Sequence, residues 1–253
     1  MQIAVLSDMH LGRKDGLDQF ARNPGAESRL YNLLDYLEEH VDKIVLLGDI
    51  FDVYRTKWFG NWAFERELRA IMQCYPQIAL KILCGPQYEL IQGNHDFPIK
   101  KLLRAREFYE IDADGKKLLF LHGHQFDAQT EDFWARHFEK FGCWAGGWLE
   151  RMGMDLTAKM NLKSKIKALN DEWPVSKFER LAAEFGKSRG ADIVITGHSH
   201  HPMKTEIDGV LFMNSGARVA GRQDLLLLDT AANKYEVHKK FNFSSQNEIS
   251  DSN

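Results

Sequence analysis

The chain has 253 residues and a mass of 29.2 kDa, which suits one large domain, whereas two independent domains would each be small. Hydrophobic residues make up 44% of the chain and charged residues 27%, a composition that excludes a disordered or fibrous protein. The formal net charge of −3 gives no overall attraction for nucleic acid.

The N-terminal sequence MQIAVLSDMH lacks the basic segment and long apolar stretch of an export signal. Nowhere in the chain do enough uncharged apolar residues run together to span a bilayer. The cysteines Cys74, Cys84 and Cys143 have no CxxC spacing, which indicates reduced thiols rather than disulfides or a zinc knuckle. We therefore expect a cytoplasmic protein.

Short apolar runs alternate with helical patterns along the first half of the chain. The runs that predict strands cover residues 3–6, 43–47, 88–91, 117–121 and 192–196. They lack strict alternation, which is typical of strands covered on both faces. Leucines at helical spacing predict a helix over 30–40, and a similar pattern predicts another over 64–75. Strands alternating with helices predict a layered α/β core with right-handed crossovers.

The pattern changes after the fourth run. Residues 127–190 are rich in Trp, Phe, Met and Lys and predict a helical insertion. Residues 205–216 and 223–241 each contain a turn between short apolar runs and predict an antiparallel sheet edge. Residues 242–253 predict a loose polar tail. The whole chain, 1–253, is thus expected to be a single domain that carries one insert.

Two stretches of the insert have more than one interpretation. Aromatic side chains at roughly helical spacing indicate either core packing or a lipid surface; they are Phe133, Trp134, His137, Phe138, Phe141, Trp144 and Trp148. A run of lysines indicates either a solvated helix face or a site for phosphate or anionic lipid; it comprises Lys159, Lys163, Lys165 and Lys167. Peripheral contact with the inner membrane surface through the insert therefore stays open.

Each of the five apolar runs is followed at once by side chains that bind metals. They are Asp8 and His10, Asp49 and Asp52, Asn94, His95 and Asp96, His122 and His124, and His198, His200 and His201. In an open α/β sheet the loops after the strands gather at one edge, so we expect these side chains to be neighbours. Imidazole nitrogens with carboxylate and amide oxygens, and no thiolate, suit Mn²⁺, Fe or Zn²⁺. The donors outnumber the ligands of one ion, and two cations sharing a carboxylate can activate a bridging water for attack on phosphorus.

The ordered pattern DxH, GDxxD, GNHD, HGH and GHxH, within residues 8–216, resembles the calcineurin-like metallophosphoesterase superfamily. The resemblance implies an α/β fold with a layered β-sandwich core, flanking helices and a helical cap insertion. It implies two divalent ions, for which we expect Mn²⁺, with Fe or Zn²⁺ as alternatives. The implied ligands are Asp8, His10 and His200 for the first ion, Asn94, His122 and His198 for the second, and Asp49 between both.

The same resemblance assigns roles to His95 and Asp52, and positions in the sequence suggest roles for three further residues. His95 matches the residue that contacts the phosphate and protonates the leaving oxygen, which suits an imidazole. Asp52 would orient His95, and Asp96 would support the GNHD turn or a ligand histidine. Arg13 is a candidate substrate contact because Arg binds phosphate in a bidentate manner. His124 is either a substrate contact or a bystander.

An insertion between the HGH and GHSH motifs resembles the UDP-2,3-diacylglucosamine hydrolase branch, whose enzymes cleave a pyrophosphate and cover the metal site with helices. That branch usually has Arg in place of His95, so a related lipid-like or nucleotide diphosphate is equally expected. GNHD is shared with general phosphodiesterases and nucleases, which form the alternative, although the net charge does not favour nucleic acid. A protein-binding scaffold without activity is a further alternative, against which the intact ligand pattern argues.

Overall fold

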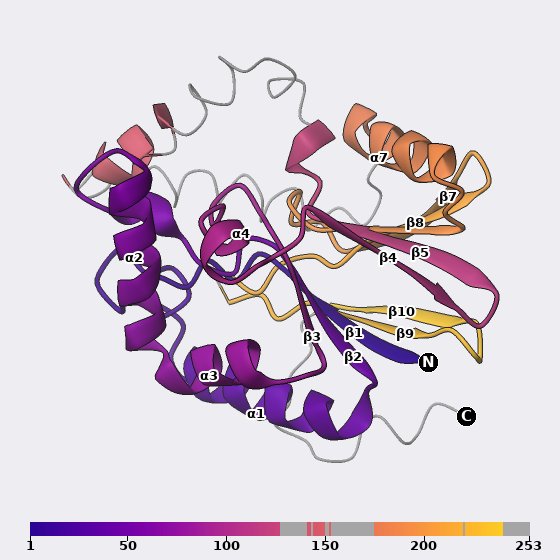
Figure 1. Ribbon diagram of the computed structural model, residues 1–253, viewed down its shortest axis with the longest axis horizontal. Helices are drawn as coiled ribbons and strands as arrows, with labels where there is room; N and C mark the ends of the chain where they lie inside the picture. The colour runs from indigo at the N-terminus through magenta and orange to yellow at the C-terminus, as the bar shows by residue number, and fades with distance from the viewer. Residues whose placement is uncertain (127–140, 143, 150–151, 153–174, 220, 240–253) are drawn as a thin grey trace.

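The computed structural model describes residues 1–126, 141–142, 144–149, 152, 175–219 and 221–239. Two five-stranded sheets form its centre (Figure 1), in the strand orders β10-β9-β1-β2-β3 and β4-β5-β6-β8-β7. The first sheet contains β1 (Gln2–Leu6), β2 (Lys43–Leu47), β3 (Tyr88–Ile91), β9 (Leu225–Asp229) and β10 (Lys234–His238). The second contains β4 (Phe108–Ala113), β5 (Lys116–Leu121), β6 (Ile193–Thr196), β7 (Met203–Ile207) and β8 (Val210–Asn214).

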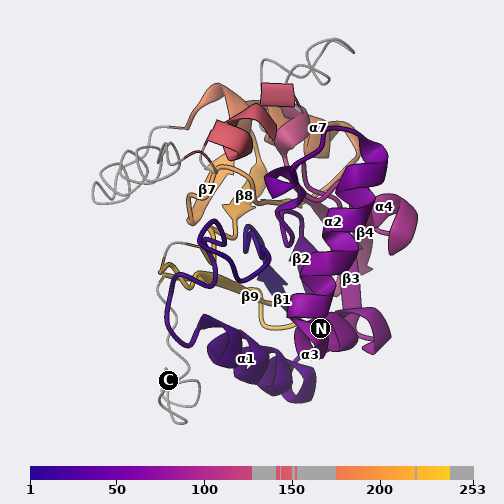
Figure 2. The same cartoon turned by 90° about the vertical axis from the view of Figure 1, so that its left-hand side faces the viewer.

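Helices cover the outer faces of both sheets. The described helices are α1 (Ala26–His40), α2 (Asn61–Cys74), α3 (Pro76–Cys84), α4 (Ile99–Leu102) and α7 (Lys177–Ser188), with short 3₁₀ turns η1 (Val53–Arg55) and η2 (His124–Phe126). Figure 2 shows the layers in order, from α7 through β7 and β8, then β9 and β1, to α1. The predicted layered core flanked by helices is confirmed.

Alternation along each strand divides the core into layers. In β1, Ala4 and Leu6 face the helices α1, α2 and α3, whereas Ile3 and Val5 face the second sheet. The second sheet packs Phe120 and other residues against the first sheet and turns its opposite face to α7. Both faces of each sheet are therefore buried, which is why the strand sequences are apolar without alternation.

The five predicted strands and both predicted helices are present, but the strands divide between two sheets. β1, β2 and β3 pair in parallel in the first sheet, and β5 and β6 pair in parallel in the second. The loops therefore gather at the end of two packed sheets, as the implied β-sandwich core requires, rather than at the edge of one open sheet. An apolar run buried on both faces reads the same in either sheet, so its sequence does not show which sheet it joins. The predicted antiparallel edges are β7 with β8 and β10 with β9, one in each sheet.

The described elements without a counterpart in the sequence prediction include the strand β4 and the helix α3. β4 is an edge strand whose residues are mostly half-exposed, and its charged residues hide the apolar pattern. α3 begins at Pro76 directly after α2 ends, since proline lacks the N–H that a continuous helix needs and suits the first helical position.

Much of the predicted insert, 127–190, lies outside the described residues, as does the tail 242–253. Within the insert, residues 144–149 and α7 are helical, as expected. Phe133, Trp134, His137, Phe138, the four lysines and Cys143 also lie outside, so their alternatives stay open. Among the described helices, none has the length and apolar character needed to cross a bilayer. Cys74 and Cys84 are free thiols.

Candidate metal centre

The loops after β1, β2, β3, β5 and β6 meet at one end of the two sheets and are tied by backbone hydrogen bonds. The amide of His10 donates to the Asp49 carbonyl at 3.0 Å, and the amide of Val53 donates to the His95 carbonyl at 3.2 Å. In the second sheet, Gly197 N–H donates to the His122 carbonyl at 3.0 Å. Side chains that lie far apart in sequence are thereby held on a shared backbone frame.

The backbone is left-handed at several of the predicted ligands. The φ angles lie between 50° and 64° at Asp8, His10, Asp49, His198 and His200. Residues with a Cβ adopt this region rarely and at a cost, and such residues gather at functional sites. The tertiary structure therefore enforces these conformations, and each turns a side chain from the end of a buried strand into the common space.

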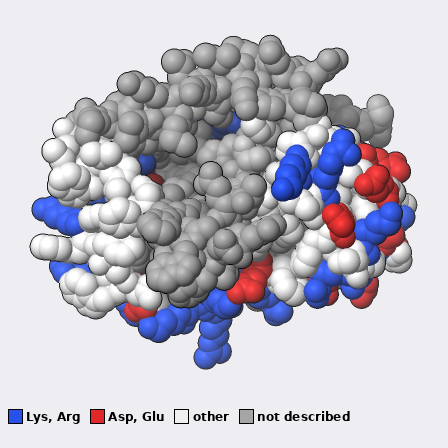
Figure 3. Space-filling view, turned by 90° about the horizontal axis from the view of Figure 1, so that it is seen from above, with Lys and Arg blue, Asp and Glu red and all other residues white. Residues whose placement is uncertain are grey.

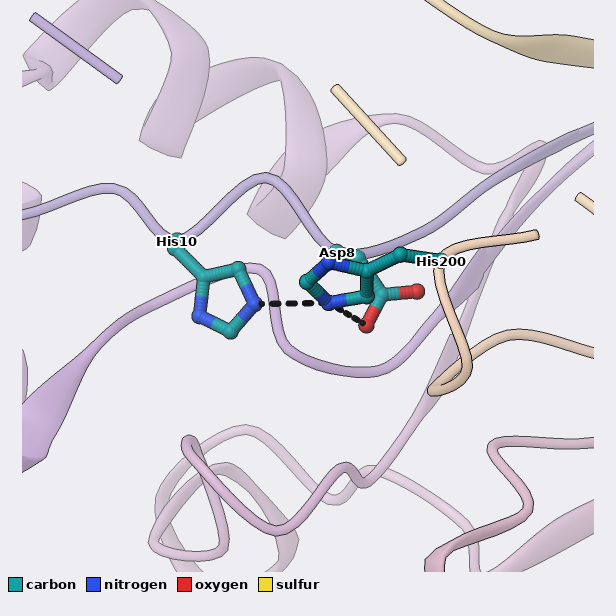
Figure 4. A group of neighbouring side chains, drawn as sticks. All are labelled: Asp8, His10 and His200. Atoms are coloured by element: carbon teal, nitrogen blue, oxygen red, sulfur yellow. Dashed lines mark hydrogen bonds and ion pairs between the residues drawn. The ribbon is translucent and has the colours of Figure 1, made fainter. Parts of the chain in front are cut away.

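Asp8, His10 and His200 form the first group of donors (Figure 4). His200 Nε2 lies 3.1 Å from Asp8 Oδ1 and 3.4 Å from His10 Nε2. Asp8 Oδ2 accepts a hydrogen bond from the His198 amide at 3.0 Å. Within the described part of the chain, its buried Oδ1 accepts no well-formed hydrogen bond, which leaves a carboxylate oxygen directed at two imidazole nitrogens. This arrangement fits a divalent cation.

Asp49, His122 and His198 form the second group, with Asn94 beside it. His122 Nδ1–H donates to the Leu47 carbonyl at 2.7 Å, which directs Nε2 into the group. That Nε2 lies 3.4 Å from Asp49 Oδ2 and 3.2 Å from Asn94 Oδ1. Asp49 Oδ2 also lies 3.8 Å from His10 Nε2, so a single carboxylate oxygen stands between the two groups.

The ionisation of these groups follows from burial and mutual attraction. Burial lowers the pKa of His122, but the Asp49 carboxylate outweighs burial and raises this pKa to about 10. Burial raises the pKa of Asp8, but His200 and His122 outweigh it and lower the pKa to about 2. Burial and His95 together lower the pKa of His10 to about 4. A cation bound near His122 would compete with its proton, so metal affinity should rise with pH.

His95 and Asp52 form a hydrogen-bonded pair beside the two groups. His95 Nδ1 lies 3.2 Å from Asp52 Oδ1, and Arg55 Nε donates to Asp52 Oδ2 at 2.8 Å. Burial lowers the pKa of His95, but Asp49 and Asp52 outweigh burial and raise the pKa to about 9. The ring of Tyr54 meets the His95 ring edge to face, with centroids 5.2 Å apart. The pair is thus oriented on both sides.

Asp96 supports the backbone rather than the open space of the site. It is fully buried, and its carboxylate accepts hydrogen bonds from the amides of Ile50 at 2.7 Å and Gly93 at 2.8 Å. Burial and the Asp49 charge raise its pKa to about 7. Asp96 therefore ties the GDIFD loop to the GNHD turn, the first of the two supporting roles that the sequence suggested.

Arg13 and His124, the predicted substrate contacts, lie on different sides. Arg13 forms an ion pair with Glu67 of α2 at 2.5 Å and lines a pocket. The ring of His124 lies 5.4 Å from that of His122 and 6.4 Å from that of His198, on η2. Of these two residues, only His124 has its ring in contact with the donor groups. A role in substrate binding remains a prediction for both.

The sequence prediction missed several supporting residues. The Asn214 amide donates to the Gly197 carbonyl at 2.6 Å, and Ser7 Oγ hydrogen-bonds Ser215 Oγ at 2.7 Å, so both fix the GHSH loop against β1. Asn214 and Ser215 directly follow an apolar run, which is the same signal that marked the five predicted loops. Arg55, three residues after Asp52, had only its spacing to indicate an ion pair.

Known proteins resemble this chain in sequence. The sequence model of the calcineurin-like phosphoesterase family matches residues 1–202. The UDP-2,3-diacylglucosamine hydrolase of Shewanella pealeana is 24% identical over 216 residues, which are 80% of this chain and 83% of that protein. That of Psychromonas ingrahamii is 29% identical over 130 residues, 49% of this chain and 47% of the relative.

Among solved structures, the phosphoesterase Yfce from E. coli has a TM-score of 0.45 at 12% identity, with 95% of this chain and 100% of that chain covered. Vps29 from Chaetomium thermophilum has a TM-score of 0.47 at 11% identity, with 94% and 95% covered. Since the family model matches well over half of the sequence and the buried histidines and aspartates gather where its motifs lie, the chain belongs to the calcineurin-like phosphoesterase family.

Proposed function

We propose that the chain is a metal-dependent phosphoesterase that hydrolyses a phosphodiester or pyrophosphate bond with two divalent cations. The observation that supports this most is the position of Asp49. Its Oδ2 lies 3.4 Å from His122 Nε2 and 3.8 Å from His10 Nε2, and these histidines belong to different donor groups. One carboxylate oxygen shared by two groups is the arrangement that a dinuclear site requires.

The proposed ligands follow the two donor groups and use the residues that the sequence suggested. Asp8, His10 and His200 would hold one ion, Asn94, His122 and His198 the other, and Asp49 both. When bound, such ions supply the Lewis acidity that phosphoryl transfer to water requires. The donor types suit Mn²⁺ first, with Fe and Zn²⁺ as alternatives.

His95 is the proposed general acid. Its Nδ1 faces Asp52 at 3.2 Å, so the proton for the leaving oxygen would come from Nε2. A pKa raised to about 9 keeps the imidazole protonated at neutral pH, which is the state that an acid needs. Asp52 acts through His95 by fixing the orientation of its ring, and Arg55 fixes Asp52 in turn. The protein thus contributes a positioned proton as well as ligands.

For the substrate we propose a nucleotide diphosphate that carries a lipid-linked sugar. The relatives' name, UDP-2,3-diacylglucosamine hydrolase, describes a compound of this kind. His95 favours a second candidate, a general phosphodiesterase or nuclease, because its GNHD motif is shared with those enzymes. Nucleic acid is the less favoured of the two. On the side of α7, the face in Figure 3 carries Lys, Arg, Asp and Glu side chains intermixed, so that part offers no basic surface for a phosphate backbone.

Hydrolysis of a substrate panel by the Mn²⁺-loaded protein would test these proposals. The panel is p-nitrophenyl phosphate, bis(p-nitrophenyl) phosphate, UDP-2,3-diacylglucosamine, ADP-ribose, cyclic nucleotides and single-stranded DNA. Selective cleavage of the glycolipid would support the diphosphate proposal. Activity on the bis-ester or DNA alone would favour the phosphodiesterase or nuclease, and no hydrolysis in the presence of Mn²⁺, Fe²⁺ or Zn²⁺ would contradict an enzymatic function.

A further inference from the structure

A pocket of about 240 Å³ lies between the loop after β1 and the loop that enters α2, and its lining residues Arg13 and Thr56 follow His10 and Asp52 closely in the sequence. Its lining combines three cationic side chains, two indoles and one carboxylate: Arg13, Lys57, Arg66, Trp58, Trp62 and Glu67. The proposed ligands and the general acid do not line it, so the pocket is separate from the groups that would act on phosphorus.

Both walls of the pocket continue directly from residues of the metal centre. Leu11 and Phe51 form a parallel bridge, and the Asp52 amide donates to the Leu11 carbonyl at 2.9 Å. Arg13 follows His10 by three residues, a span of at most about 10 Å in an extended chain. On the other wall, η1 starts directly after Asp52 and leads to the loop that contains Trp58. A phosphate at the centre and a group in the pocket could therefore belong to one small molecule.

The indoles present open aromatic faces beside cations. Trp58 is 68% exposed and Trp62 is 66% exposed, which is unusual for side chains of this size. The Arg66 guanidinium lies over the Trp62 ring, 5.6 Å from its centroid. Exposed aromatic rings next to Arg and Lys form the stacking platforms on which proteins bind nucleobases, because each base offers a flat π-face.

The pocket lining is largely apolar and includes one ion pair, between Arg13 and the buried Glu67. Glu67 is only 3% exposed, and its carboxylate is held by the ion pair with Arg13. A carboxylate at this depth accepts hydrogen bonds from ring N–H groups, which a planar base carries on its edge. Because covering an ion pair with hydrocarbon is costly, this pair disfavours an acyl chain as the occupant.

We propose that this pocket binds the nucleobase of a nucleotide-containing substrate while the phosphate to be cleaved lies at the metal centre. The base stacks on Trp58 or Trp62, its edge meets Glu67, and Lys57 and Arg66 neutralise the adjoining phosphate. This inference rests on the proposed function and deepens it, since it makes nucleoside-linked phosphodiesters and diphosphates the preferred class.

Binding can be tested in the metal-free protein, independently of activity. Calorimetry with uridine 5′-monophosphate should show binding, whereas ribose 5-phosphate, which lacks the base, should bind much more weakly. Trp62→Ala and Trp58→Ala should each weaken nucleotide binding, by about tenfold for the indole that stacks on the base. Trp148→Phe is the matched control, because Trp148 is 43% exposed and does not line the pocket. Equal binding of the two phosphates, or no effect of either alanine variant, would overturn the proposal.

Turnover provides the second test, with two esters that share a leaving group. Thymidine 5′-p-nitrophenyl phosphate should have a KM about tenfold below that of methyl p-nitrophenyl phosphate, and the double variant Trp58→Ala/Trp62→Ala should remove the difference. Equal KM values in the wild-type protein would overturn the pocket but leave the phosphoesterase proposal intact. Hydrolysis of neither ester, together with tryptophan-dependent nucleotide binding, would contradict the proposed function and support the pocket.

A third measurement separates the pocket from a membrane surface. Sedimentation with phosphatidylglycerol vesicles should be the same for the wild-type protein and the double variant if the indoles serve a nucleobase. Vesicle binding that is lost in the double variant, combined with no effect on uridine 5′-monophosphate, would show that these side chains contact lipid and would overturn the proposal.

Discussion

At the scale of single residues, the centre depends on a few side chains that act through one another. Asp49 connects the two donor groups, its Oδ1 accepts the His95 amide at 2.8 Å, and its charge raises the pKa of His95. Asp52 and Arg55 then orient His95 from the other side. Metal binding and acid catalysis are therefore linked through one carboxylate, and substitutions should separate the two properties.

Asp49→Ala should reduce metal binding at both proposed positions. The variant loses the only carboxylate oxygen that lies near both His10 and His122 among the described residues, so metal content should fall well below two equivalents after dialysis. Elemental analysis of the Mn²⁺-loaded protein measures this. Asp112→Ala, which removes an exposed carboxylate from β4, is the control and should keep the wild-type content. Two equivalents in Asp49→Ala would refute the bridging role.

His95→Ala should keep both metals and the fold but lower turnover by a factor of about 10²–10⁴, because the variant lacks the proposed general acid. The loss should be large for an alkyl phosphodiester and smaller for bis(p-nitrophenyl) phosphate, whose leaving group needs no proton. Steady-state rates on the two esters measure this dependence. An equal loss on both would assign His95 to phosphate binding instead, and unchanged rates would remove it from the mechanism.

Asp52→Asn should shift the pH dependence of turnover. Burial lowers the pKa of His95, whereas Asp49 and then Asp52 raise it, so removing the Asp52 charge should lower it. The acid form is present below the pKa and is lost as pH rises through it, so the alkaline decline of kcat should begin at lower pH in the variant. A pH profile on an alkyl phosphodiester tests this, with Asp112→Asn as control. If the alkaline decline of kcat began at the same pH in Asp52→Asn as in the wild-type protein, the proposed pairing of Asp52 with His95 would be contradicted.

At the scale of elements, the site depends on where strands end. Gly48 and Gly93 follow β2 and β3 and let the loops approach each other closely. A Cβ on Gly48 would overlap the His122 ring, and Gly48 adopts a φ of 84°. The apolar strands fix the position at which each loop begins, and the glycines then allow the donor side chains to converge.

Gly93→Ala should damage both stability and the centre. The added Cβ would overlap the carboxylate and the backbone nitrogen of Asp49, so the loop must shift. We expect a loss of about 1–3 kcal/mol in the free energy of unfolding, typical of overpacking, together with weaker metal binding. Denaturant titration and metal analysis measure the two effects. Gly16→Ala is the control, since its Cβ would meet nothing within 4 Å. Wild-type values for both would show that the Asp49 loop is free to move.

The elements also show how much the sequence could predict. The five strands that precede the ligands were visible because buried β-strands leave continuous apolar runs. Which strand joins which sheet was not visible, since pairing depends on contacts distant in sequence, such as that of β1 with β9. The His95 and Asp52 pair followed from family motifs. The pocket around Trp62 did not, because exposed tryptophans and arginines form no pattern before the chain folds.

At the scale of the whole molecule, the centre lies where the two sheets meet. Asp8 and Asp49 follow strands of the first sheet, whereas His122 and His198 follow strands of the second. α7 covers the second sheet, with Ala182 packed into the same cluster as strand residues of β5, β6 and β8. This helix belongs to the core although it lies inside the expected insert, so a deletion that tests the insert has to end before it.

Replacing residues 127–174 by a short Gly/Ser linker should leave both sheets folded. The flanking elements η2 and α7 are close, with the rings of Phe126 and Phe178 6.4 Å apart, so a short linker can join them. If the insert caps large substrates, turnover of UDP-2,3-diacylglucosamine should fall about tenfold or more, while bis(p-nitrophenyl) phosphate should change far less. Thermal unfolding provides the control for folding. Equal losses on both substrates would contradict a capping role.

The place of β1 inside its sheet affects the order in which the protein can be completed during synthesis. β1 pairs on one side with β9, which is translated more than two hundred residues after it. Until then, β1 offers an unpaired edge to other chains, which favours aggregation of incomplete products. Asp8 and His10 follow this strand and His200 precedes β9, so every proposed donor is translated before β1 is paired on both sides.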